Sequence, residues 1–208
     1  RHGRRPMDGW QEVVRSMDYE HEHMLRGGTV SNFFLRESLT LSHPVFVGGC
    51  YGLMISVALL LPLYYGDSQN NFVELARDWG LQSLVIVSMT SILGAFSILS
   101  STLIKRPPAR LQDWKKILFV FPFIGLSIVS ISTIHGFGGE FFLEFGWFLY
   151  ILPGPLWVHL SYAPRWRIIE RIDRGLDPFE GMGKTIYGSN SRFSNPEDRE
   201  LDEVVEII

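Results

Sequence analysis

The chain has 208 residues, 46% hydrophobic and 20% charged, with a formal net charge of −3 and one cysteine. These averages match those of an ordinary soluble domain, but the distribution excludes a soluble globular fold, because residues 44–65, 81–104, 117–134 and 141–160 hold only one charged side chain, Glu144. The single cysteine, Cys50, excludes a disulfide framework, a paired-cysteine redox motif and a cysteine-rich metal site.

The four uncharged windows have the length of membrane-spanning helices. A hydrocarbon core of about 30 Å needs roughly 17–25 residues of α-helix, and lipid tolerates only helices or closed barrels. The runs 53–63 and 118–129 are nearly continuously apolar, whereas a barrel strand would alternate. We therefore expect an all-α integral membrane protein, with a four-helix transmembrane domain at 44–160 between terminal regions 1–43 and 161–208.

Lysine and arginine are distributed unevenly between the connections. Six lie before the first window, five in the second connection and seven after the fourth window, whereas the first and third connections contain only Arg77. The positive-inside rule then predicts that both termini lie on the cytoplasmic side, or on the stromal or matrix side of an organelle membrane. The choice between a bacterial inner membrane and an organelle membrane stays open.

The N-terminal region shows helical periodicity. Residues of one largely apolar stripe recur there at spacings of three and four, namely Trp10, Val13, Val14, Met17, His21, Met24 and Leu25. This pattern predicts one amphipathic helix from about Gly9 to Arg26, at the membrane interface or against a partner protein. A second short amphipathic stretch is expected from Ser31 to Leu39.

The first two windows are rich in small residues. Gly48 and Gly52 form a small-xxx-small pair, and Ser91 and Gly94 lie in the serine- and threonine-rich second window. Such residues let helices approach closely in lipid, so we expect these four to pack helices together. An alternative hypothesis makes the hydroxyl-rich second span the lining of a channel or transporter.

Glu144 is the one charge inside an apolar window, and such charges are functional candidates. With Glu140 and His135 it forms a hypothetical metal or proton-relay site. The simpler interpretation places both carboxylates at the aqueous interface, near the positive end of a helix dipole.

Histidine suggests a cofactor hypothesis. His43 directly precedes the first window, His135 directly follows the third window, and His159 lies near the end of the fourth window. A neutral imidazole can be an axial ligand of haem or of a chlorophyll magnesium. No cofactor is required by the sequence, and histidine is also common at helix ends for structural reasons.

The fourth window contains Pro153, Gly154 and Pro155. Because proline removes a backbone donor, we expect about fourteen regular residues followed by a kink or a short unwound turn. Beyond it, Pro164 and Gly175 bracket a short amphipathic helix. Aromatic and arginine side chains there are expected to anchor the chain at the lipid interface, namely Trp157, Trp166, Arg165, Arg167 and Arg171.

The sequence has no phosphate-binding loop, nucleophile triad or nucleic-acid-binding patch, so no catalytic residue is nominated. We expect a non-catalytic accessory or scaffolding subunit of a larger membrane complex, such as a respiratory or photosynthetic energy-transducing assembly. Its partners would be other integral membrane subunits and lipids. A haem- or chlorophyll-binding subunit and a small channel or transporter are the alternatives.

Overall fold

The computed structural model describes residues 8–17, 19–26, 29–35, 39–66, 71–109 and 115–182. This part of the chain is helical and contains no strand. Four of its helices are long and apolar enough to cross a membrane, Pro44–Gly66, Phe72–Ile104, Ile117–His135 and Gly139–Asp173. The all-α, four-span fold expected from the sequence is therefore confirmed.

The first two spans pair as a hairpin. Helix α4 (Pro44–Ala58) begins where His43 Nδ1 accepts a hydrogen bond from the Val45 N–H, and it is followed by α5 (Leu60–Gly66). Helix α6 (Phe72–Ile104) begins nine residues before the expected window, because Asn71 Oδ1 caps the Glu74 N–H. The first turns of α6 carry charged side chains, so they lie outside the uncharged window at 81–104.

The last two spans form the second hairpin, α7 (Lys115–His135) and α8 (Gly139–Ile151). Of the two alternatives expected after the regular part of the fourth span, a kink or a short unwound turn, the unwound turn is absent. Leu152 keeps helical dihedrals, and helix continues through α9 (Pro153–Trp157), the π-helix η1 (Val158–Tyr162) and α10 (Ala163–Asp173). The Leu152 N–H bonds the Phe148 carbonyl at 3.0 Å, and the Leu156 N–H bonds the Leu152 carbonyl at 3.0 Å, so helical bonds bridge the prolines.

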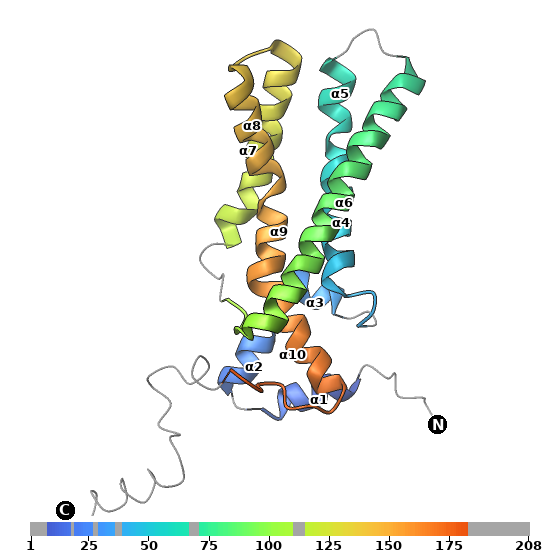
Figure 1. Ribbon diagram of the computed structural model, residues 1–208. Helices are drawn as coiled ribbons and strands as arrows, with labels where there is room; N and C mark the ends of the chain where they lie inside the picture. The colour runs from blue at the N-terminus through green and yellow to red at the C-terminus, as the bar shows by residue number, and fades with distance from the viewer. Residues whose placement is uncertain are drawn as a thin grey trace, which may run out of the picture.

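The two hairpins approach each other near one end of the molecule and diverge toward the other (Figure 1). Helix α6 leans away from α7 and α8 at the open end, whereas α5 stays near α7, where a β-carbon on Gly66 would lie 3.0 Å from Thr133 Cγ2. At the closed end, α10 and the N-terminal helices form a separate layer, which we call the base.

The base contains α1 (Asp8–Arg15), α2 (Tyr19–Arg26) and α3 (Thr29–Phe34). The expectation of one helix from Gly9 to Arg26 is wrong, because α1 ends where the Ser16 hydroxyl bonds the Val13 carbonyl at 2.8 Å. The break lets Val14 of α1 and Leu25 of α2 pack in one cluster against α10.

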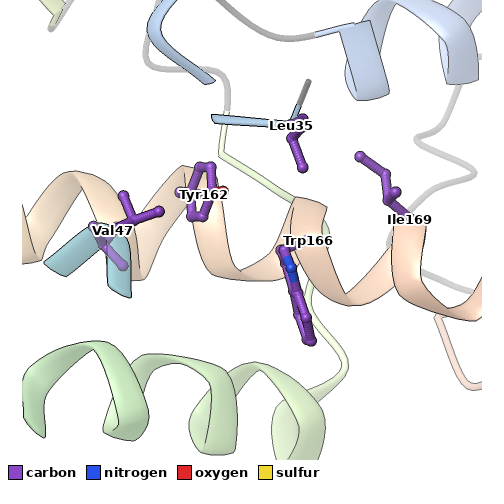
Figure 2. Packing of buried hydrophobic residues seen from close by; sticks show 6 residues of the cluster. Leu35, Val47, Tyr162, Trp166 and Ile169 are labelled. Atoms are coloured by element: carbon purple, nitrogen blue, oxygen red, sulfur yellow. The ribbon is translucent and has the colours of Figure 1, made fainter. Parts of the chain in front are cut away.

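A second cluster joins the base to the spans. Figure 2 shows Leu35 beside α10, Trp166 on α10, and Val47 of α4 beside Tyr162, the last residue of η1. The Tyr162 hydroxyl donates to the Ser42 carbonyl at 2.6 Å, and Trp166 Nε1 donates to the Leu39 carbonyl at 3.1 Å. These bonds hold the segment before the first span against the end of the fourth.

Candidate functional site

Helix α10 is the buried centre of the base and positions its arginines. All residues from Ala163 to Ile169 are buried, including Arg165 and Arg167, each with 6% of its surface exposed. An isolated guanidinium is expensive to bury unless it is paired or hydrogen-bonded. The contacts of these two side chains therefore define the chemistry of the base.

Arg165 faces the N-terminal helices. Its Nη1 donates to the Ser31 hydroxyl at 2.5 Å, and its Nη2 donates to the Met24 carbonyl at 3.4 Å. Met24 lies in the last turn of α2, where free carbonyls and the helix dipole favour a cation. Arg165 thus ties α2 and α3 to the end of the fourth span.

Arg167 faces the opposite side of α10 and reaches the end of the second span. Its Nη1 donates to the Ser101 carbonyl in the last turn of α6, and its Nη2 lies 3.4 Å from Met182 Sδ. The same carbonyl accepts the Lys105 N–H at 3.1 Å. Arg167 therefore caps the C-terminus of α6.

The π-helix explains how the connection after α6 is held. The Ala163 N–H bonds the Val158 carbonyl, five residues back, and Pro164 has no N–H, so the His159 and Leu160 carbonyls need other donors. Arg106 Nη2 donates to the His159 carbonyl at 2.5 Å, and the Ala109 N–H donates to the Leu160 carbonyl at 2.9 Å.

The base has more buried positive charge than its described carboxylates neutralise. The Nε atoms of Arg106, Arg165 and Arg167 are buried without a hydrogen-bond partner. Among the described residues, the ion pairs of this region join Arg171 to Glu180 and Arg174 to Glu170 instead. The three arginines thus depend on carbonyl groups and helix ends rather than on carboxylates.

Two of the three histidines proposed as cofactor ligands contact different aromatic rings. His43 packs edge-on against Trp166 with ring centroids 4.6 Å apart, and His159 stacks on Phe96 with centroids 6.0 Å apart. Burial lowers the pKa of His43, and the nearby Glu170 carboxylate partly opposes this shift. The His43 Nδ1 already accepts the Val45 N–H, so only Nε2 is left for another ligand.

The proposed metal ligands lie at the open end. His135, Glu140 and Glu144 are all exposed, on the last turn of α7 and the first two turns of α8. In the described ranges, no three histidine, cysteine or acidic side chains gather closely enough to hold a metal ion. The structure does not bring these three residues together as a coordination site.

The glycines expected at helix contacts lie between α4 and α6. A β-carbon on Gly48 would lie 2.5 Å from the Thr90 carbonyl oxygen, and one on Gly94 would lie 2.4 Å from the Pro44 carbonyl oxygen. Ser91 faces Gly49, with its hydroxyl 2.7 Å from a β-carbon built there. The two backbones therefore approach more closely than larger side chains would permit.

Some hydroxyl groups of α6 bond within the helix, whereas those of Ser83 and Ser101 are buried without a hydrogen-bond partner. Thr90 donates to the Ile86 carbonyl at 2.9 Å and Ser97 to the Leu93 carbonyl at 2.6 Å, and both side chains are buried. A hydroxyl bonded one turn back in this way satisfies its donor within its own helix.

The residues expected to anchor the chain in lipid divide into two groups. Arg165, Arg167 and Trp166 are buried inside the base and bonded to protein groups, so their donors face protein rather than solvent or lipid in this conformation. Trp157 and Arg171 are partly exposed, and for them interfacial anchoring stays a prediction.

Sequence reasoning did not single out Lys105 and Arg106 at the end of α6, or the tyrosines that bond across the hairpins. A Lys-Arg-Pro-Pro run after an apolar window was the available signal for the first pair, and it was used only for orientation. No protein-family model, curated protein or solved structure matches this chain.

Proposed function

We propose that the chain is a non-catalytic accessory or scaffolding subunit of a larger membrane assembly. The observation that supports this best is the exposure of the second hairpin. Only 11% of the apolar window in the third span is buried within the chain, and large aromatic side chains on it, such as Phe119 and Phe123, are exposed. Aromatic faces of this kind suit packing against another subunit.

Glu144 is an ionisable residue on the other helix of this hairpin, α8. It is exposed on α8 beside Phe141, Phe145 and Phe148, of which 80%, 44% and 56% of the surface is exposed. A carboxylate on an apolar helix face is costly in lipid and is usually paired. A partner helix that presents a hydrogen-bond donor or a cation would satisfy it.

The test is purification of the tagged full-length chain from its native membrane in mild detergent, followed by mass spectrometry. We expect other integral membrane subunits to copurify, and respiratory or photosynthetic chains are the first class to look for. Recovery of a free monomer or homo-oligomer would overturn the proposal. Glu144→Leu should lose partners that the matched variant Glu140→Leu, one turn closer to the helix start, retains.

We also propose that the base lies on the cytoplasmic side, or its organellar equivalent. The positively charged ends of the spans support this orientation. In a Cys50→Ser background, a membrane-impermeant thiol reagent added outside intact cells should label a cysteine at Phe137, an exposed residue at the open end, and should leave one at Leu176, exposed in the base, unlabelled. The opposite labelling pattern would reverse the orientation.

A further inference from the structure

The end of α6 gathers three cationic side chains, Lys105, Arg106 and Arg167, which we call the α6 cation site. Lys105 sits at the helix C-cap with φ 52° and ψ 37°, and it is the one non-glycine residue with positive φ in the described part of the chain. Glycine is the usual residue at this position, because a β-carbon is strained there. A lysine at this position suggests a role for its side chain.

The Lys105 side chain crosses the turn that covers Arg167. A β-carbon built on Gly181 would lie 2.5 Å from Lys105 Cδ and 2.8 Å from Nζ. The next residue, Met182, contacts the Arg167 guanidinium through its sulfur. The ammonium and the guanidinium thus flank the same short turn, and neither forms an ion pair with a described carboxylate.

The donors of the site are incompletely used. Arg106 donates a hydrogen bond from Nη2 to the His159 carbonyl, and its Nε is buried without a partner. Arg167 is 6% exposed, and its Nε is unpartnered as well. Lys105 itself is exposed. An oxyanion with several acceptor oxygens, such as a phosphate group, matches a site of this kind.

The surroundings of the site indicate which molecule carries the anion. The site ends a membrane-spanning helix, and the residues of α6 just before it expose large apolar surfaces: Leu103 is 73% exposed, Ile104 66% and Leu99 57%. A phosphate bound by Lys105 would therefore have an apolar track beside it on the same helix. Phospholipids combine these two features, and basic clusters between membrane helices are known recognition sites for their headgroups.

We propose that the α6 cation site binds the phosphate group of an anionic phospholipid, whose acyl chain lies along Leu103, Ile104 and Leu99. Lys105 and Arg106 contact the phosphate. The buried guanidinium of Arg167 adds to the positive electrostatic potential at the phosphate. This proposal is independent of the accessory-subunit role, because a free monomer would carry the same site.

The experiment measures lipid binding to the purified full-length chain by native mass spectrometry. Phosphatidylglycerol and phosphatidylcholine with matched acyl chains are the probes, and we expect the anionic lipid to bind more tightly. Lys105→Gly should weaken phosphatidylglycerol binding about fivefold, the contribution expected of one cation near an anionic headgroup. Arg77→Gln, which removes an exposed cation at the open end, should leave the affinity unchanged.

Lys105→Gly also separates binding from folding. Glycine relieves the strain at positive φ, so the lipid-free variant should unfold at the same or a higher temperature than the unaltered protein. Equal affinity of the variant and the unaltered protein for phosphatidylglycerol would overturn the proposal, as would equal binding of the two lipids. Inorganic phosphate that binds as tightly as phosphatidylglycerol would also overturn it and assign the site to a free anion.

Discussion

At Gly52 of α4, the absence of a side chain allows the backbones of α4 and α6 to lie close together. A β-carbon there would lie 2.3 Å from the Thr90 hydroxyl oxygen and 3.0 Å from Val87 Cα. The neighbouring atoms are a buried side chain and a backbone, so neither can move without separating α4 from α6. Gly80, in the same α6, has no atom within 4 Å of such a β-carbon.

Gly52→Ala is therefore expected to lower the free energy of unfolding by about 1–3 kcal/mol, the usual cost of overpacking. Gly80→Ala should raise it by up to about 1 kcal/mol, because alanine is the better helix former. Unfolding in mixed micelles with an increasing fraction of denaturing detergent measures both. Similar effects of the two substitutions would show that α4 and α6 do not pack as closely as the structure indicates.

At the scale of the element, helix boundaries were predictable where hydropathy alone decides them. The first span was expected at 44–65 and is observed at Pro44–Gly66, and the third was expected at 117–134 and lies in α7, Lys115–His135. The start of α6 and the continuity of the fourth span were not predictable in this way. The first depends on a cap at Asn71, and the second depends on donors from Arg106 and Ala109, which are more than fifty residues away.

The start of α4 makes the fold sensitive to pH. His43 Nδ1 can accept the Val45 N–H only while the imidazole is neutral, and burial lowers the pKa of His43 from its usual 6.5. The unfolded chain then binds a proton more readily than the folded one. The stability contributed by neutral His43 is complete above pH 6.5 and decreases as the pH falls below that value.

We expect the unfolding free energy to fall more between pH 7.5 and 5.5 in the unaltered protein than in His43→Asn. Asparagine keeps a capping acceptor but does not titrate. The difference between the two unfolding curves isolates His43 from the other histidines. A pH dependence that is the same in both proteins would mean that the imidazole is equally easy to protonate in the folded and unfolded states.

At the scale of the whole molecule, the sequence predicted four spans but not how they are grouped. Hydropathy counts spans, whereas grouping depends on individual close contacts. Gly48 and Gly94 bring α4 against α6, and Gly125 brings α7 against α8, where its β-carbon would lie 2.4 Å from the Tyr150 backbone nitrogen. The candidate sites were likewise predictable only in part. The sequence identified the arginines of α10 as a group, but their burial depends on helices α1 to α3 and could not be predicted.

Two tyrosines join the hairpins near the middle of the spans. The Tyr51 hydroxyl donates to the Tyr150 carbonyl at 3.0 Å, and the Tyr150 hydroxyl donates back to the Ile55 carbonyl. Gly154 makes room for this contact, because a β-carbon there would lie 2.2 Å from the Tyr51 ring. The glycine of the Pro-Gly-Pro run therefore allows the Tyr51 ring to pack closely against the helix, and the helix continues through the run.

Tyr150→Phe and Tyr51→Phe should each lower the unfolding free energy by about 1 kcal/mol, because each removes a hydrogen bond that joins the two hairpins. The two effects should not be additive, since both bonds belong to one contact. Spin labels at Phe72 and Phe137, exposed at the open ends of the two hairpins, should report a broader distance distribution in the double variant. Tyr64→Phe, on a side chain that is 63% exposed, is the control. An unchanged distribution in the double variant would mean that the two tyrosine bonds do not set the separation of the hairpins at the open end.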